Sequence, residues 1–146
     1  MIRSYIAENR ARFMEEWASL IRIPSISCQP AHKDDMLRCA ERWRELLLEA
    51  GAQHAEVMPS KGNPFVYAEY SPMEVEGERL EVKGKNIPTV LVYSHYDVMP
   101  VEPLDLWQSN PWEPTIREGR LYARGADDDK GQAMIQVKAF EYLVKH

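Results

Sequence analysis

Two long stretches of the chain repeat apolar residues at the spacing of an amphipathic helix. The first covers residues 3–21 and is expected to end before Pro24, because a proline disfavours helical backbone in the residue ahead of it. The second covers residues 34–50 and is followed by Gly51, a residue type that commonly ends helices. The faces that these helices should bury consist of Ile6, Arg10, Phe13, Trp17, Leu20 and Ile21 in the first and of Met36, Ala40, Trp43, Leu47 and Leu48 in the second.

The remaining apolar patterns predict strands and one more helix. Residues 57–58 and 64–70 have the composition of strands, and the charged stretch 72–86 predicts an exposed hairpin or loop. Residues 88–94 form a near-continuous apolar run, which is typical of a strand buried on both faces. A third helix is expected over residues 130–145, because Ala133, Val137, Phe140 and Val144 would share one of its faces.

This order of elements indicates an α/β domain with helices layered against a sheet. In such domains ligands gather beyond the carboxyl ends of the strands. His95 and Asp97 follow the apolar run 88–94 directly and would leave the predicted buried strand at that end. The hydrophobic pattern therefore places the first candidate functional residues at the edge where α/β domains bind ligands.

Composition narrows the classes of function. The 146 residues, 45% of them hydrophobic and 28% charged, suit one globular domain. A net charge of −5 argues against nucleic acid or an anionic membrane as the main partner. The sequence shows no apolar run long enough to span a membrane and no apolar core of a signal peptide near its start. Cys28 and Cys39 are expected to be free thiols, with a disulfide or a metal-binding pair as the alternatives, so the expected location is the cytoplasm.

The pair His95 and Asp97 has the spacing at which two side chains of an extended segment point to the same side. Both could bind one metal ion. Alternatively, His95 could be the ligand while Asp97 accepts a hydrogen bond from its second ring nitrogen, which fixes the tautomer and supports metal binding. A loop histidine that is simply paired with a nearby carboxylate is the non-functional interpretation.

Three consecutive acids, Asp127, Asp128 and Asp129, stand just before the predicted third helix. Acidic residues favour a helix N-terminus, so capping alone could explain them. Three acids exceed what capping needs, however, and their mutual repulsion would be relieved by a divalent cation. Gly125 precedes this cluster and would allow tight backbone geometry, and Lys130 could pair with an acid that is not a ligand.

Five segments together resemble a family of zinc metallopeptidases, which includes carnosinase-type dipeptidases, aminoacylase, carboxypeptidase G and succinyl-diaminopimelate desuccinylase. The segments are residues 23–27, 94–101, 107–114, 119–126 and 128–132. Their order and spacing are specific. The residues around Asp97 and those from Asp128 to Gln132 are most similar to the corresponding residues of the carnosinase-like dipeptidases. The resemblance covers most of this chain but only about the first third of a typical family member.

The resemblance implies a role for each matching residue. His95 would be a ligand of one zinc ion, and Asp128 would bridge two zinc ions through its carboxylate. Asp97 would belong to the catalytic site as the carboxylate that orients His95. The peptide bond between Asp128 and Asp129 is often cis in such proteins. Asp127 stands where the family often has a small or uncharged residue, so it is not expected to be a ligand.

The resemblance also implies a fold and a reaction. Residues 1–146 would be the N-terminal portion of a three-layer α/β/α catalytic domain with a mixed, mostly parallel sheet. A complete member would bind two zinc ions, with cobalt or manganese as substitutes, and hydrolyse dipeptides or related N-acyl and peptide amide bonds. Its general-base glutamate, its remaining ligands, its lid and dimerisation domain and its C-terminal half have no counterpart in these residues.

We therefore expect this chain to be inactive alone, and two further interpretations stay open. The chain could be a non-catalytic remnant that acts only in folding and association. Separately, the unpaired strands of a partial sheet invite self-association, so a homodimer is expected. The chain could instead be an α/β domain that binds a small molecule, with the acids merely capping a helix. In a zinc titration, the absence of binding tighter than about millimolar would favour the remnant over the metal site. Small-molecule binding that persists after metal ions are removed with a chelator would support the binding domain.

Overall fold

Three helices form the largest part of the structure, a computed structural model that describes residues 1–72, 74–75, 78–79 and 88–146. They are α1 (Ile2–Ile21), α2 (Lys33–Glu49) and α3 (Lys130–Lys145). Each begins and ends within one residue of the bounds that the sequence predicts. The three helix predictions are confirmed, including the end of α1 ahead of Pro24.

The strands pair as short antiparallel hairpins. In the first and longest hairpin Ala55 lies opposite Ala68. The strands are β1 (His54–Met58) with β2 (Phe65–Glu69), β3 (Glu74–Val75) with β4 (Glu78–Arg79), and β5 (Thr115–Arg117) with β6 (Arg120–Tyr122), and two 3-10 turns occur at η1 (Pro30–His32) and η2 (Leu104–Leu106). The hairpin predicted within residues 72–86 is present as β3 and β4, whereas 73, 76–77 and 80–86 lie outside the described residues.

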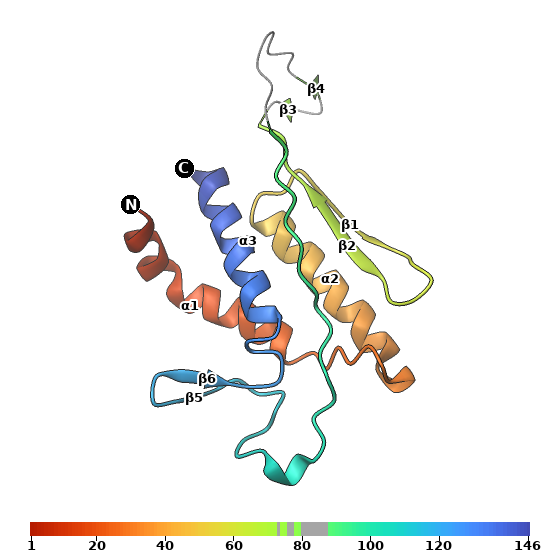
Figure 1. The fold of residues 1–146 in the computed structure, drawn as a ribbon. Helices are drawn as coiled ribbons and strands as arrows, with labels where there is room; N and C mark the ends of the chain where they lie inside the picture. Colours follow the sequence, from red (N-terminus) through yellow and green to blue (C-terminus); the bar gives the residue numbers. More distant parts are fainter. Residues whose placement is uncertain (73, 76–77, 80–87) are drawn as a thin grey trace.

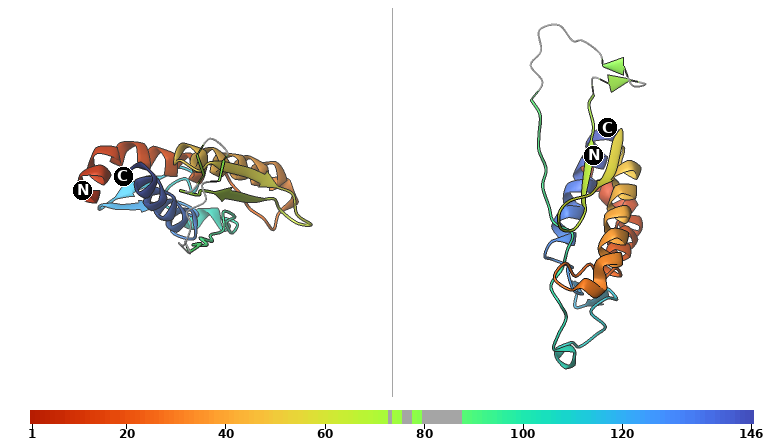
Figure 2. Two further views of the ribbon diagram at one scale, coloured as in Figure 1. Left: turned by 90° about the horizontal axis from the view of Figure 1, so that it is seen from above. Right: turned by 90° about the vertical axis from the view of Figure 1, so that its right-hand side faces the viewer.

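The helices and hairpins have a simple spatial arrangement. Helix α1 contacts both α2 and α3, and the β1–β2 hairpin packs on α2 (Figure 1). A long extended stretch from residue 88 onward runs past α2 and α3 toward the end of the molecule that carries η2 and the β5–β6 hairpin (Figure 2). The two chain ends lie close together at the opposite end of the helices (Figure 1).

One hydrophobic core joins the three helices. Leu20 and Leu46 are completely buried in it, and Trp43 is 5% exposed. The stretch that leads from α1 toward α2 contributes Ile23, and the extended stretch contributes Tyr96 at its border. The other members are Cys39, Ala50, Ala133, Met134 and Val137. Burial of this apolar surface is the main force that holds α3, and the loop before it, against α1 and α2.

The C-terminus of α2 explains how the chain turns toward β1. The Gly51 amide donates to the Leu48 carbonyl at 2.9 Å and the Ala52 amide to the Leu47 carbonyl at 3.0 Å, the two hydrogen bonds of a Schellman motif. Gly51 has a φ of +109°, and a Cβ there would lie 2.7 Å from a methyl carbon of Val144. The predicted stop at Gly51 is confirmed, and it also lets α3 approach α2 closely.

The prediction of a buried strand over residues 88–94 is wrong for this structure. Val90, Leu91 and Tyr93 are 80%, 90% and 83% exposed, and the segment is extended without pairing to any strand in the described part of the chain. An apolar run becomes a buried strand only where neighbouring strands and a covering layer meet it. The described residues place α2 and α3 near one side of this segment and nothing on the other (Figure 2).

The α/β class is confirmed by three helices and antiparallel hairpins. The mostly parallel sheet of the expected three-layer domain is not formed, because every strand pair in the described residues is antiparallel. Parallel strands need crossover partners, and the one segment with the composition of such a strand, 88–94, has no partner among the described residues. The antiparallel hairpins, in contrast, pair strands that are adjacent in the sequence, and a short turn is enough to join them.

Two smaller expectations have clear outcomes. Cys28 is exposed and Cys39 is buried, and both are free thiols, as predicted. Burial raises the pKa of the Cys39 thiol, which keeps it protonated.

None of the helices described in the structure has the length and apolar character needed to cross a membrane.

Candidate metal site

The extended stretch brings His95 and Asp97 into contact. The His95 Nδ1 atom lies 3.1 Å from the Asp97 Oδ1 atom, so one ring nitrogen faces the carboxylate. The side chain of His95 is 45% exposed and that of Asp97 is 37% exposed. The two residues therefore point to the same side, as their alternating spacing predicts, and the pair is reachable from solvent.

The acidic loop before α3 meets the other side of the same histidine. The Asp128 Oδ1 atom lies 3.0 Å from the His95 Nε2 atom, and the Asp128 side chain is 82% exposed. The peptide bond between Asp128 and Asp129 is cis, as the resemblance implied. His95 is thus held between two carboxylates from segments more than 30 residues apart in the sequence.

Asp129 does not act as a helix cap through its side chain. It occupies the N-cap position of α3, yet its side chain makes no capping hydrogen bond. Its Oδ2 atom instead accepts a hydrogen bond from the His95 backbone amide at 3.1 Å. The carboxylate therefore anchors the histidine segment to the loop, which helix capping alone does not explain.

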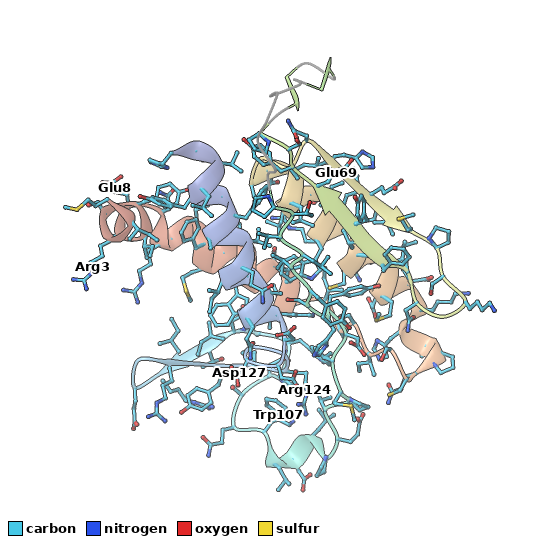
Figure 3. All side chains as sticks on the ribbon, turned by 45° about the horizontal axis from the view of Figure 1, so that its top comes forward. Arg3, Glu8, Glu69, Trp107, Arg124 and Asp127 are labelled. Atoms are coloured by element: carbon cyan, nitrogen blue, oxygen red, sulfur yellow. The ribbon has the colours of Figure 1, made fainter. Side chains whose placement is uncertain are left out.

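Asp127 stands apart from this arrangement. Its Oδ1 atom accepts a hydrogen bond from the Gln132 side chain at 3.3 Å. It also borders a hollow of about 420 Å³ whose other lining residues include Trp107 and Tyr122. Figure 3 shows Asp127 close to Trp107 and Arg124 below the start of α3. The structure therefore brings Asp128 and Asp129 to His95 and directs Asp127 to other partners.

The loop is fixed in place from its buried side. Lys130 is completely buried, and its Nζ atom donates hydrogen bonds to the carbonyls of Leu20 and Ile23, both at 2.8 Å. These carbonyls belong to the C-terminal end of α1 and the residues after it, where the helix dipole favours a cation. Burial lowers the pKa of Lys130, against the opposing effect of Cys39, Asp35 and Asp97. The expected pairing of Lys130 with a neighbouring acid is wrong, because the side chain turns inward to backbone carbonyls.

Close packing joins the two halves of the site. Gly125 has a φ of +73°, and a Cβ there would lie 2.5 Å from a methyl carbon of Val98, a buried residue directly after Asp97. A side chain at position 125 would therefore push the acidic loop away from the histidine segment. The glycine before the acidic cluster thus allows the tight approach that the sequence suggested.

The carboxylates shift the pKa of the histidine. Partial burial lowers the pKa of His95, but Asp97, Asp128 and Asp129 together outweigh that effect and raise it above its ordinary value. Three anionic groups around one imidazole favour a positive charge at their centre. A metal cation bound at this position would reduce the repulsion among these carboxylates in the same way.

The atoms present fit part of a zinc site. His95 Nε2 and Asp128 Oδ1 are ligand types that zinc prefers, and their 3.0 Å separation is close to the roughly 3.3 Å expected between two tetrahedral ligands that each lie about 2.0–2.1 Å from zinc. Among the residues that the structure describes, no group of three or more His, Cys, Asp or Glu side chains is arranged to hold a metal. Asp97 faces Nδ1 instead, the atom that a supporting carboxylate contacts.

Sequence reasoning missed two contributors to this arrangement. Asp129 was considered only as part of a charged cluster, although it holds the His95 amide. The Ser27 hydroxyl donates a hydrogen bond to Asp97 Oδ2, and no local pattern links residues that lie 70 positions apart in the chain. The only signal at Ser27 was its place in residues 23–27, one of the five segments that carry the resemblance.

Comparison with protein families identifies the same region. Residues 91–146 match the sequence model of Peptidase family M20/M25/M40. The chain is 31% identical over 138 residues to the cysteinylglycine-S-conjugate dipeptidase of Corynebacterium striatum, an alignment that covers 94% of this chain and 28% of that protein. The matched region contains His95, Asp97 and Asp128.

Solved structures support the relationship. The chain superposes on human carnosine dipeptidase 1 with a TM-score of 0.76 and 25% identity, covering 94% of this chain and 29% of that one. It superposes on an M20 family metallo-carboxypeptidase from Sulfolobus solfataricus with a TM-score of 0.73 and 33% identity, covering 91% and 27%. The chain thus spans less than a third of the length of each of these proteins.

Proposed function

We propose that this chain, which belongs to the M20 peptidase family, forms the N-terminal part of the catalytic domain of a dinuclear zinc metallopeptidase. The substrates would be dipeptides or compounds with related N-acyl or peptide amide bonds. Support for this class comes from the names of two similar proteins, a cysteinylglycine-S-conjugate dipeptidase and a carnosine dipeptidase. In the proposed enzyme residues 1–146 belong to a three-layer α/β/α domain, in which other strands cover residues 88–94.

The observation that carries the proposal is the position of His95 between two carboxylates. Asp97 contacts Nδ1 and so favours the tautomer that carries its proton there, which leaves Nε2 with a free lone pair. Nε2 faces Asp128 at 3.0 Å. Two donor atoms of zinc-binding type, one from His95 and one from Asp128, therefore converge on one point, and the Asp97 carboxylate orients the ring.

Each residue would have a defined part in hydrolysis. His95 and Asp128 would hold zinc, and Asp97 would keep the imidazole in its binding orientation. Bound zinc would supply Lewis-acid polarisation of the amide carbonyl and stabilise the charge that develops there. The residues described here include no glutamate placed to move the proton, so the general base would lie outside them. These 146 residues alone are expected to bind metal weakly and to lack hydrolytic activity.

Zinc titration by isothermal calorimetry tests this proposal. The wild-type chain is expected to bind zinc more tightly than about millimolar, since the loop and the histidine segment are already held together. The His95→Ala variant is expected to lose that binding, because it removes one of the two identified ligands. Thermal unfolding of both proteins establishes that the variant is folded.

The matched control is His54→Ala, which removes an exposed imidazole from β1, away from the acidic loop. This variant is expected to bind zinc as the wild type does. Equal zinc affinity in the wild type and in His95→Ala would contradict the metal site, and so would a wild-type chain that binds no zinc.

Self-association is a second candidate function, favoured by the exposed apolar residues of segment 88–94. Leu91 is 90% exposed and Val92 is 61% exposed, and backbone edges of this kind pair readily with other chains. We expect dimers or larger species of the wild type in analytical ultracentrifugation, and a monomer for Leu91→Lys. The control Leu143→Lys, at a 75% exposed position of α3, should associate as the wild type does. A wild-type chain that stays monomeric at high concentration would exclude this function.

A further inference from the structure

Residues 23–27 lie directly beside the segment that carries Asp97. The Ser25 hydroxyl donates a hydrogen bond to the Tyr96 carbonyl at 2.7 Å, and the Val98 amide donates to the Ser25 carbonyl at 2.9 Å. Ser25 is completely buried. These two hydrogen bonds hold the backbone on both sides of Asp97 and place Ser27 opposite its side chain.

The two oxygens of Asp97 have different partners. Oδ2 accepts a hydrogen bond from the Ser27 hydroxyl, and Oδ1 lies 3.1 Å from His95 Nδ1. The last torsion of an aspartate side chain is broad, so an unsupported carboxylate can rotate and present its oxygens at many angles. The hydroxyl of Ser27 restricts this rotation while leaving Oδ1 directed at the histidine.

We propose that Ser27 is a positioning residue of the metal site, whose hydroxyl holds the Asp97 carboxylate in the orientation that keeps the His95 proton on Nδ1 and Nε2 open for zinc. This role rests on the proposed function, since it concerns the same site. Hydrogen bonds that orient a metal-binding histidine through its supporting carboxylate affect metal affinity even though they touch neither metal nor substrate.

A purely structural role for Ser27 would predict different contacts. The backbone bonds that join the two segments are made by Ser25, and Lys130 fixes the start of the same stretch through the Ile23 carbonyl. The hydroxyl of Ser27 instead donates its hydrogen bond to the side chain of Asp97. Removal of that hydroxyl should therefore leave the fold intact and change the orientation of one carboxylate.

The test is the tautomer of His95, measured through two-bond ¹⁵N–¹H couplings in the metal-free chain at a pH where the imidazole is neutral. The measurement uses an Asp128→Ala background, because Asp128 otherwise faces Nε2 at 3.0 Å and competes for the ring proton. In this background the chain with Ser27 is expected to carry the proton mainly on Nδ1. Ser27→Ala is expected to shift the population toward the Nε2-protonated form that free histidine prefers, whereas Ser27→Thr keeps a hydroxyl and should leave the tautomer unchanged. With Asp128 present, zinc affinity should fall about tenfold in Ser27→Ala and stay near the wild-type value in Ser27→Thr.

Ser19→Ala is the matched control, because its hydroxyl bonds to a backbone carbonyl within α1, that of Glu16 at 2.6 Å. It should change neither tautomer nor zinc affinity. An unchanged His95 tautomer in Ser27→Ala would overturn the role of Ser27. Absence of zinc binding by the wild type would instead contradict the proposed function, and the tautomer comparison would still decide whether Ser27 orients His95 through Asp97.

Discussion

Replacement of Glu141 with glutamine is expected to lower the free energy of unfolding by about 3 kcal/mol, the low end of the cost of removing one partner from a buried ion pair. Glu141 is completely buried on α3. Its carboxylate accepts hydrogen bonds from Tyr5 and Arg12 of α1 and from Lys138 and Lys145 of its own helix. Glutamine would leave Arg12 and Lys138 with Glu16 as their remaining shared carboxylate at the α1–α3 contact. Urea denaturation followed by circular dichroism measures the difference.

The same carboxylate makes stability depend on pH. Burial raises the pKa of Glu141, but hydrogen bonds from Arg12, Lys138, Tyr5 and Lys145 outweigh it, so the pKa in the folded state lies below its ordinary value. A lowered pKa stabilises the folded state fully above the pKa of an unfolded glutamate, about 4.3, and the contribution is lost as the pH falls toward the folded pKa. The gap in stability between wild type and Glu141→Gln should therefore be largest near neutral pH and narrow in acid.

Glu8→Gln provides the control for this prediction, because it makes the same chemical change at an exposed position near the start of α1 (Figure 3). Its stability should stay within about 0.5 kcal/mol of the wild type, as is usual for surface substitutions. A Glu141→Gln variant as stable as Glu8→Gln at neutral pH would show that the buried network adds nothing to the α1–α3 contact.

Replacement of Asp128 with asparagine is expected to weaken zinc binding at least tenfold, whereas Asp127→Asn should leave it nearly unchanged. The two residues are adjacent, equally charged and exposed, so the general electrostatic loss is the same in both variants. They differ in contacts, since Asp128 faces His95 Nε2 and Asp127 bonds to Gln132. Zinc titration of the two variants side by side separates ligation from long-range attraction.

An equal loss of zinc affinity in Asp128→Asn and Asp127→Asn would mean that the acidic loop attracts zinc only through its net charge. A larger loss in Asp127→Asn would move the ligand by one residue and contradict the roles that the resemblance implies. Asparagine is close in shape to aspartate, and both side chains point to solvent, so neither variant should disturb the fold.

Local patterns in the sequence were enough to predict the helices, strand β2 within residues 64–70 and the last two residues of β1. Proline and glycine fix the ends of α1 and α2 by local geometry, and apolar spacing identifies the faces that pack together. Segment 88–94 was mispredicted because burial of an apolar run depends on what lies beside it, which composition does not encode. Lys130 was mispredicted for a similar reason, because its carbonyl partners at Leu20 and Ile23 lie more than 100 residues away in the sequence.

The residues of the candidate site that belong to a sequence motif could be predicted from the sequence. The spacing of His95 and Asp97 anticipated that their side chains would meet, and the resemblance pointed to Asp128, which the structure brings to the same imidazole. The supporting contacts of Ser27 and Asp129 depend on how distant segments lie together, so they became visible only in the fold. The assignment of these residues to zinc remains a proposal that the geometry supports.

The central claim is that His95 and Asp128 bind the same metal ion. A crystal structure of the chain grown with zinc, with anomalous diffraction recorded at the zinc absorption edge, tests it most directly. The account predicts an anomalous peak about 2.0–2.2 Å from both His95 Nε2 and Asp128 Oδ1, with Asp97 still on Nδ1. A peak that lies elsewhere on the chain, or no peak between these two side chains, would contradict it.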